Sequence, residues 1–331
     1  MSLPVPADSI TDCFALLDDS DASAAYPRSR LYSKHVGTLT CQRADQLPAL
    51  LQQMQQALQQ GQFAVTLFSY ELGAALHGIA PHAAATSVAQ PLAEILLFER
   101  CETLSAEQVA AWLAQQQQTA PAGIANVHAD INETTFDAAI ARIHDYIVAG
   151  DTYQVNYTFR LRFDAYGSLP ALYRRLRARQ PVPYGALIAL PDGRAVMSLS
   201  PELFVRHANS QLTVQPMKGT AAASGDMQQD EASAHALASD PKNRAENLMI
   251  VDLLRNDLGR IADIGSVAVE NLFEVQRYSS VLQMTSTVHA RLRDELALPE
   301  IFAALYPCGS ITGAPKHRTM QIIRELEASP R

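Results

Sequence analysis

The sequence is poor in residues that mark several classes of protein. Only four of its 331 residues are cysteine, and they stand far apart with no CxxC pair: Cys13, Cys41, Cys101 and Cys308. This spacing argues against a disulfide framework or a cysteine zinc site and indicates free thiols in a reducing compartment. The first ten residues lack the basic start and the apolar stretch of a secretory signal. We therefore expect a cytoplasmic protein.

Long hydrophobic runs and an excess of basic side chains are also missing. The longest apolar runs, such as residues 186–190, suit a strand and fall far short of the roughly 18 residues of a membrane span. With 26 Lys and Arg against 34 Asp and Glu, the net charge is −8, which disfavours binding to a phosphate backbone. The hydrophobic fraction of 48% is too high for a disordered chain. The composition indicates a globular protein that binds neither nucleic acid nor membrane.

The chain divides into two regions of different composition. Residues 1–120 are rich in Ala, Gln and Leu and poor in reactive groups, with a predicted helix at 48–60 and a predicted strand at 62–70. The segment Thr119-Ala120-Pro121-Ala122-Gly123 has the composition of a linker. We predict an N-terminal α/β region over 1–120 and a second region, which carries the chemistry, over 121–331.

The second region combines strands with helices. Phe136, Ile140, Ile143 and Ile147 stand at helical spacing and predict a helix over 135–149. A longer helix is predicted from Asp240, a good N-cap, to about Leu258, before a glycine that suits the C-cap. Strands are predicted at 153–163, 184–190, 195–199, 203–207 and 212–215. Runs of strands followed by helices indicate an α+β fold with a largely antiparallel sheet.

The first candidate site is a hairpin. Two strand-like stretches flank the turn residues Ala208-Asn209-Ser210. Around a turn centred on residue 210, Glu202 and Lys218 are equidistant, so a hairpin would place them as cross-strand neighbours about 5 Å apart. A carboxyl and an amine side by side can divide the roles of acid and nucleophile, and burial would keep such an amine uncharged. An ordinary surface ion pair is the alternative.

The second candidate site is on the long helix, where carboxylates share the apolar stripes. Glu246 lies on one stripe with Ile250, Leu253 and Asp257, and Asp252 lies on another. A carboxylate on an apolar stripe is costly unless it is paired or binds a cation. One hypothesis is a Mg²⁺ ligand, since Mg²⁺ takes one or two protein carboxylates and completes its shell with water and substrate. Salt bridging is the alternative, with Arg244, Arg255 or Arg260 as partners.

The third candidate site is the stretch 306–320. It combines two glycines and two hydroxyl side chains with a helix start near Pro315. Free main-chain N–H groups in such a loop can bind a carboxylate or a phosphate. The spacing is not that of a P-loop. A helix-capping turn is the alternative.

Together these segments resemble the chorismate-utilising enzymes over roughly residues 136–331. The resemblance is carried by Tyr153-Gln154-Val155-Asn156, Ser200-Pro201-Glu202, Pro216-Met217-Lys218-Gly219-Thr220, the helix segment 244–257 and Gly313-Ala314-Pro315-Lys316. It implies the α+β fold of anthranilate synthase component I, with antiparallel sheets packed against helices. Within the family, Lys218 in its Pro-x-Lys-Gly-Thr setting resembles component I of the aminodeoxychorismate synthases, whereas anthranilate synthases carry a small residue there.

The resemblance implies a covalent mechanism. Lys218 would attack the ring of chorismate and displace its hydroxyl, and Glu202 would protonate the leaving hydroxyl as the general acid. Ammonia would then release the lysine and give aminodeoxychorismate, a precursor of p-aminobenzoate and folate. The resemblance also implies that Glu246 binds Mg²⁺. The implied substrate-binding residues are Gly309, Ser310, Gln283 and Lys316.

Partners are implied by the same resemblance. The chain shows no amidotransferase cysteine, so ammonia is expected from a separate glutamine amidotransferase subunit. Some relatives of this subgroup are paired with an aminodeoxychorismate lyase. Other members of the family form anthranilate, isochorismate or salicylate, and each of these products is an alternative for this chain. A truncated remnant without catalytic activity is a further alternative.

Three features depart from the family's pattern. Gln283 stands where many relatives carry a histidine near the substrate. Leu16-Leu17-Asp18-Asp19 and Pro183-Tyr184-Gly185 only partly match the segments that bind tryptophan in relatives. Relatives also continue with further strands beyond the helix after Pro315. The resemblance therefore implies a C-terminally truncated chain with an exposed sheet edge and exposed apolar surface.

Overall fold

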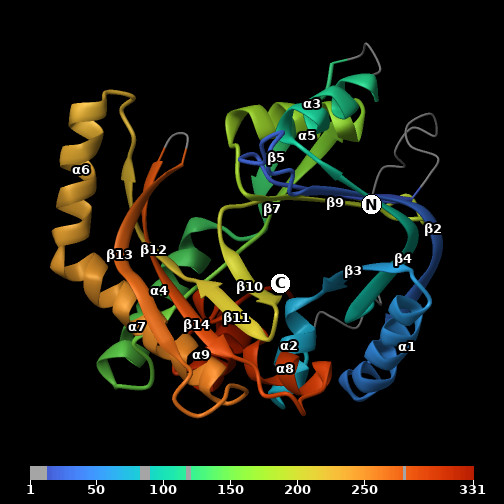
Figure 1. The fold of residues 1–331 in the computed structure, drawn as a ribbon. Helices are drawn as coiled ribbons and strands as arrows, with labels where there is room; N and C mark the ends of the chain where they lie inside the picture. The colour runs from blue at the N-terminus through green and yellow to red at the C-terminus, as the bar shows by residue number, and fades with distance from the viewer. Residues whose placement is uncertain (1–12, 83–89, 117–120, 279–280) are drawn as a thin grey trace.

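The computed structural model describes residues 13–82, 90–116, 121–278 and 281–331, which form an α+β fold around two antiparallel sheets (Figure 1). This confirms the predicted fold class. The predicted linker at 119–123 falls partly outside the described residues. Among the helices of the described part, none has the length and apolar character needed to cross a membrane.

A six-stranded antiparallel sheet is built mainly from the first half of the chain. In spatial order its strands are β3 (Phe63–Phe68), β4 (Ala93–Leu104), β2 (Ser29–Cys41), β1 (Phe14–Asp18), β8 (Tyr184–Ala189) and β9 (Ala195–Ser200). Its helices are η1 (Ala44–Gln46), α1 (Leu47–Gln59), α2 (Tyr70–Leu76), α3 (Ala106–Gln115) and α5 (Leu169–Arg179). Because β8 and β9 come well after residue 120, this sheet draws on both predicted regions. The boundary predicted at 120 therefore does not separate one sheet from the other.

The second sheet has five strands. These are β10 (Leu203–Ala208), β11 (Gln211–Gln215), β12 (Met217–Ala222), β13 (Ala268–Tyr278) and β14 (Val281–Arg291). β11 and β12 run along the same side of β14, with Val214 paired to Val288 and Met217 to Thr285. Pro216 lies between the two strands, and because proline has no N–H for the ladder it interrupts them.

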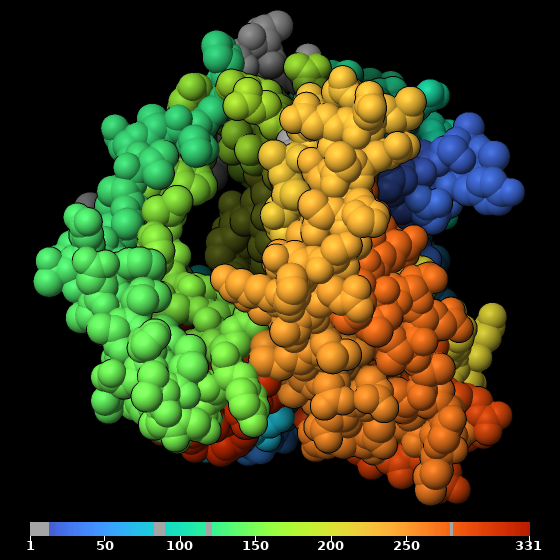
Figure 2. Space-filling view, turned by 90° about the vertical axis from the view of Figure 1, so that its left-hand side faces the viewer, coloured from blue at the N-terminus to red at the C-terminus, as the bar shows by residue number. Residues whose placement is uncertain are grey.

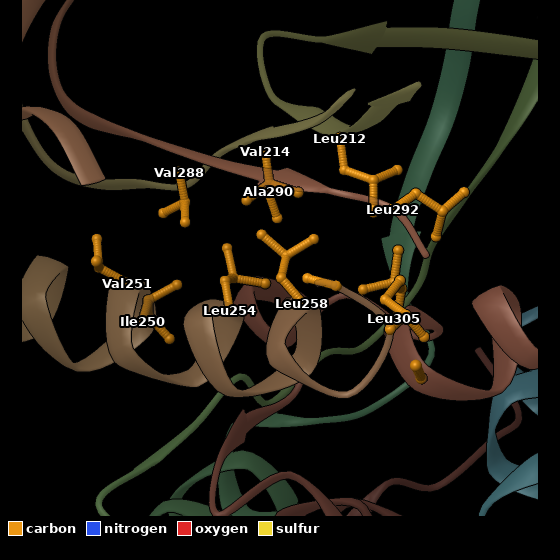
Figure 3. Packing of buried hydrophobic residues seen from close by; sticks show 13 residues of the cluster. Leu212, Val214, Ile250, Val251, Leu254, Leu258, Val288, Ala290, Leu292 and Leu305 are labelled. Carbon is orange, nitrogen blue, oxygen red and sulfur yellow. The ribbon is translucent and has the colours of Figure 1, made fainter. Parts of the chain in front are cut away.

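Helix α7 (Pro241–Gly259) packs across one face of the five-stranded sheet. Asp240 caps it as predicted, accepting the main-chain N–H of Asn243 at 2.7 Å. Apolar residues of α7 meet apolar residues of β11 and β14 in a buried core (Figure 3): Ile250, Val251, Leu254 and Leu258 against Leu212, Val214, Val288 and Ala290. α6 (Met227–Ser239) and α8 (Leu298–Leu305) lie beside α7. α8 also packs onto α1, so it joins the cores of the two sheets.

Residues 121–166 form a smaller part beside the two sheets. It holds α4 (Glu133–Val148) and a two-stranded sheet of β5 (Gly123–Ala129) and β7 (Leu161–Tyr166). In the space-filling view a hollow opens between the upper part of its green surface and the gold residues, while lower down green and orange residues meet (Figure 2). The strand predicted at 153–163 is wrong in part. Only β6 (Gln154–Val155) and the start of β7 are extended there.

The apolar stripe of α4 is mostly open to solvent. Phe136, Ile140 and Ile147 are 36%, 42% and 40% exposed, whereas Ile143 is only 7% exposed. The helix itself was predicted correctly. Its described neighbours cover Ile143 but leave most of the stripe uncovered.

Candidate functional site

The hairpin of β10 and β11 turns at Asn209-Ser210 as predicted, and both residues have positive φ. Its register differs from the prediction. Leu203 pairs with Gln215, and extending this register does not bring Lys218 across from Glu202. The predicted cross-strand pair is therefore wrong. The turn centre lies half a residue earlier than expected, and the register shifts again between residues 203 and 206.

Glu202 and Lys218 are nevertheless close enough for the positive charge of the lysine to act on the carboxyl. Burial raises the pKa of Glu202, while the hydrogen bond from Ser310, the charge of Lys218 and the main chain of Met217 oppose that shift. Ser310 Oγ donates to Glu202 Oε1 at 2.6 Å. Burial dominates, so the pKa stays above the ordinary range of a glutamate. A carboxyl whose pKa is raised holds its proton more tightly than an ordinary glutamate, which suits an acid.

The backbone beside Lys218 lies against α7. Gly219 has φ +85°, and a Cβ built there would lie 3.0 Å from Asn243 Oδ1 in the first turn of α7. The β12–β14 register also shifts between Met217 and Thr220. A glycine is therefore needed at this position, and it brings the strand of Lys218 against the start of α7. Lys218 is half-buried, and its amine makes no hydrogen bond or ion pair with the described residues.

One face of α7 runs along the candidate site. Residues 243, 246, 250, 253 and 257 recur at intervals of three or four and so share that face. Asn243 lies against Gly219 at one end, and Leu253 lies against Gly309 ten residues later. Glu246 stands between these two contacts. It is therefore placed between the strand that carries the amine and the loop at the other end.

The carboxylates of α7 have different surroundings. Glu246 is half-buried, and no described residue forms a hydrogen bond or ion pair with it. Asp252 is exposed and pairs with Arg255 at 2.9 Å, so the salt-bridge alternative holds for Asp252. Nowhere in the described ranges do three or more His, Cys, Asp or Glu side chains gather as a metal site. Glu246 is therefore a single carboxylate, and a Mg²⁺ ion held there would take its other ligands from substrate and water; this site stays a prediction.

Ser310, which contacts Glu202, lies in the loop between α8 and α9 (Lys316–Leu326). Gly309 begins the short 3-10 helix η3 (Gly309–Ile311), and a Cβ there would lie 2.6 Å from Leu253 Cδ2. The Cys308 thiol lies 2.9 Å from Ser310 Oγ, and burial raises its pKa. Gly313 and Ala314 form β15, which pairs with β6. The close packing on α7 orients Ser310 towards the carboxyl.

The N-terminal part of the chain also holds this loop. Tyr306 donates its hydroxyl to the carbonyls of Phe68 and Ser69 at 3.0 and 2.8 Å. His77 Nε2 lies 3.1 Å from the carbonyl oxygen of Tyr306. A Cβ on Gly73 would come within 2.6 Å of Pro307 Cδ. Helix α2 thus supports the loop from the side opposite α7.

Two of the four predicted substrate-binding residues have other partners. Lys316 is 7% exposed, and its Nζ binds Asp257 Oδ2 at 2.5 Å and the Leu305 carbonyl at 3.3 Å. A buried ammonium committed in this way is not available to a substrate, so the structure does not support that role for Lys316. Gln283 lies on β14 and donates to Thr220 Oγ1 at 3.4 Å. Its substrate contact stays a prediction, as do those of Gly309 and Ser310.

A cavity of about 580 Å³ opens beside the site. Residues that flank Glu202 and Lys218 line one side of it, namely Pro201, Leu203 and Met217. The lining also includes Ser20, Asp21, Pro183 and Tyr184, which belong to or adjoin the segments that partly match a tryptophan pocket. The β13 residues Gln276, Arg277 and Tyr278 also line it, and they were missed because the hairpin of β13 and β14 was not predicted. The alternation of Leu282, Met284 and Val288 was the available signal for that hairpin.

Comparisons with known proteins bear on this arrangement. The sequence model of a family described as chorismate binding enzyme matches residues 14–331. Aminodeoxychorismate synthase component 1 of Klebsiella aerogenes is 41% identical over 226 residues, which cover 67% of this chain and 49% of that protein. Anthranilate synthase component 1 3 of Haloarcula marismortui is 37% identical over 243 residues, which cover 71% of this chain and 47% of that protein. These similar identities do not separate the two activities.

A solved structure shares the fold. Anthranilate synthase component I from Streptococcus pneumoniae TIGR4 superposes with a TM-score of 0.70 at 26% identity, over 82% of this chain and 66% of that chain. This confirms the predicted fold of the anthranilate synthase component I type. The chain spans about half the length of the two curated relatives.

Proposed function

Because the chain belongs to the family of chorismate binding enzymes, we propose that it acts as component I of an aminodeoxychorismate synthase. The observation that carries the proposal is the position of the half-buried Lys218 near Glu202, whose carboxyl accepts from Ser310 Oγ at 2.6 Å and has a pKa raised by burial. In the family that the sequence resembles, Lys218 is the residue that separates this activity from anthranilate formation. The relative from Klebsiella aerogenes bears the name of this activity and the one from Haloarcula marismortui that of the alternative, so the choice rests on Lys218.

In the proposed reaction Lys218 is the nucleophile. Its amine, in the uncharged form, forms a bond to the chorismate ring carbon next to the one that bears the enolpyruvyl ether. Both ring double bonds shift by one position, and the C–O bond to the hydroxyl breaks. Glu202 gives its proton to that oxygen, so water leaves and the nitrogen of Lys218 is positively charged. Ammonia then adds where the hydroxyl was, both double bonds shift back, and the bond to Lys218 breaks to release the free amine. The extra proton on the new ammonium group returns to Glu202, which leaves aminodeoxychorismate.

The proposal includes Mg²⁺ at Glu246. The ion would supply positive charge to hold a carboxylate of the substrate. Glu246 lies one turn along α7 from Asn243, which contacts Gly219 next to Lys218. Calorimetry of Mg²⁺-dependent chorismate binding tests this. Glu246→Gln is expected to abolish the dependence, whereas the exposed carboxylate variant Asp252→Asn is expected to retain it. Equal binding by both variants would remove Glu246 from this role.

Ammonia is proposed to come from a glutamine amidotransferase subunit, and the product to pass to an aminodeoxychorismate lyase. Both partners follow from the proposed reaction, which consumes ammonia and forms an intermediate of p-aminobenzoate synthesis. A pull-down with purified amidotransferase tests the first contact. Glutamine-dependent product formation by the mixture is the expected result, and a mixture that forms product from added ammonium but not from glutamine would argue against that partner.

The central experiment uses the purified chain with chorismate, Mg²⁺ and ammonium. Aminodeoxychorismate is expected, and Lys218→Ala is expected to reduce its formation to background because the nucleophile is lost. Lys34→Ala is the matched control, since Lys34 is an exposed lysine on β2, outside the site. Unchanged product formation by Lys218→Ala would refute the covalent mechanism.

Product analysis also separates the other activities of the family. Isochorismate or salicylate formed without ammonia would identify Lys218 as a residue that activates water, and anthranilate would identify the other amination. A folded chain that fails to bind chorismate in the presence of Mg²⁺ would be a binding remnant at most. Each of these results would contradict the proposed amination.

A further inference from the structure

The ends of the Ser310 loop are joined at a buried ion pair. The loop begins after Leu305, the last residue of α8, and ends at Lys316, the first residue of α9. Lys316 Nζ binds the Leu305 carbonyl at 3.3 Å and Asp257 Oδ2 at 2.5 Å. A single ammonium group therefore closes the base of the loop and attaches it to α7.

The ion pair is well shielded from water. The side chains of Lys316 and Asp257 are 7% and 4% exposed. Removing two charges from water is costly, and a well-packed apolar pair of similar size often stabilises a fold as much. An apolar pair does not fix the relative orientation of the two side chains. An ion pair does, because charge-assisted hydrogen bonds are short and angle-dependent. The pair thus suits a position where geometry matters more than stability.

A chain of short contacts leads from this base to the reacting carboxyl. Asp257 and Leu253 lie one turn apart on the same face of α7. A Cβ built on Gly309 would lie 2.6 Å from Leu253 Cδ2, so the two residues are in close contact. The next residue, Ser310, donates to Glu202 Oε1 at 2.6 Å. A loop that slid on α7 by a fraction of an ångström would lengthen that hydrogen bond.

We infer that Lys316 and Asp257 form a positioning pair, which holds the Ser310 hydroxyl on the Glu202 carboxyl. Neither residue touches the reacting atoms, and both act through the loop. The inference rests on the proposed function only in that Glu202 is taken as the acid. Its test needs no substrate, so a failure of the proposed amination would leave it standing.

The test follows how Ser310 affects the protonation of Glu202. The unfolding free energy is measured against pH for each protein and for its Glu202→Gln counterpart, and the divergence of the two curves reports the pKa of Glu202. Four backgrounds are compared: the parent chain, Ser310→Ala, the double variant Lys316→Met with Asp257→Leu, and the triple variant. The other groups that act on Glu202, which are Lys218 on β12 and the Met217 main chain, are unchanged in all four, as are the nearby Cys308 and Tyr278.

In the parent chain Ser310→Ala is expected to raise the pKa of Glu202, because it removes a donor that favours the charged form. The Lys316/Asp257 double variant is expected to raise it as well. In that background Ser310→Ala is expected to add no further shift, because the hydrogen bond is already lost. A full Ser310→Ala shift in the double variant would overturn the inference and leave the ion pair with a purely structural role.

A second ion pair provides the control. Arg194, in the turn between β8 and β9, binds Glu94 of β4 at 2.8 Å, and their side chains are 44% and 9% exposed. Arg194→Met with Glu94→Leu is expected to leave the Ser310→Ala shift intact. If the Lys316/Asp257 double variant does not fold, Asp257→Asn takes its place, since it keeps the size and an acceptor. A reduced Ser310→Ala shift in Asp257→Asn supports the inference, and an undiminished shift refutes it.

Discussion

At the scale of single residues, opposing effects meet at Glu202. Burial disfavours its charged form, while Ser310, Lys218 and the Met217 main chain favour it. Burial prevails, so folding raises the pKa of the carboxyl. The contribution of Glu202 to the free energy of unfolding is therefore fully present below the pKa that it has in the unfolded chain. It is lost as the pH rises through the raised pKa of the folded state.

Replacing this carboxyl with an amide gives a pH-dependent prediction. Glu202→Gln is expected to match the parent in stability below about pH 4, near the ordinary pKa of glutamate, where both side chains are neutral. As the pH rises through the raised pKa, the parent loses stability that the variant keeps. Denaturant unfolding between pH 3 and 8 measures the difference. A variant that is less stable than the parent at neutral pH would contradict the sign of the shift.

Gly219 gives a second prediction at the same scale. An alanine there would have a strained φ of +85° and a Cβ only 3.0 Å from Asn243 Oδ1. Gly219→Ala is therefore expected to lower the free energy of unfolding by about 1–3 kcal/mol. Gly150→Ala is the control, because Gly150 has φ +78° with no atom within 4 Å of a built Cβ. It is expected to cost only about 1 kcal/mol, from the backbone conformation alone. Equal losses in thermal unfolding would show that the contact with α7 has no effect.

At the scale of elements, α4 shows that a hydrophobic stripe does not by itself identify the residues that a fold buries. The spacing of Phe136, Ile140 and Ile147 predicts a helix correctly, but these side chains remain largely exposed. The stripe shows which residues of the helix are apolar. Which of them are buried depends on the elements that pack against the helix. For α4 the buried residues are Ala139, Ile143 and Tyr146.

Two isoleucines of α4 are therefore expected to respond differently to truncation. Ile143→Ala is expected to cost about 2–4 kcal/mol, because it removes buried methyl groups and leaves a cavity. Ile140→Ala, at 42% exposure, is expected to change stability by no more than about 0.5 kcal/mol. Chemical denaturation of both variants measures the contrast. Comparable losses would mean that Ile140 is covered in solution.

The site shows a similar division between what local sequence reveals and what it does not. The cap at Asp240, the turn at Asn209 and the stripe of Glu246 depend on neighbours in sequence, and all three were predicted. The bond from Ser310 to Glu202 joins residues 108 positions apart, and no local pattern encodes it. The ion pair of Lys316 was missed for the same reason, because its partner Asp257 lies 59 residues away.

At the scale of the whole molecule, apolar side chains are unevenly distributed over the surface. About half of the large exposed hydrophobic residues in the described ranges lie between residues 124 and 166. All six residues of β7 are exposed, and β5 is exposed beyond Gly123. Figure 2 shows a hollow between the upper part of this green surface and the gold residues, and contact with the orange residues lower down. A surface of this kind binds other apolar molecules more readily than scattered single residues do.

This surface is expected to bind the dye ANS in the native state at neutral pH. Replacing Leu161 and Phe163 of β7 with serine is expected to reduce the fluorescence at least about twofold, because exposed apolar surface is what the dye reports. Val36→Ser with Ile264→Ser is the control, since both residues are exposed but lie outside the 124–166 segment. Equal fluorescence from the parent and the β7 variant would argue against one contiguous apolar surface.

Helix α7 connects these scales. Asn243 faces Gly219 next to the amine, and fourteen residues later Asp257 holds the loop whose hydroxyl meets the acid. The position of Ser310 relative to the strand of Lys218 is thus tied to a count of residues along one helix. A single extra residue between Glu246 and Leu253 would turn everything beyond it by about 100° and advance it by about 1.5 Å. The loop of Ser310 and the strand of Lys218 would then no longer meet the same face of α7, although every side chain was retained, so the length of this helix matters to the site as well as the identity of its side chains.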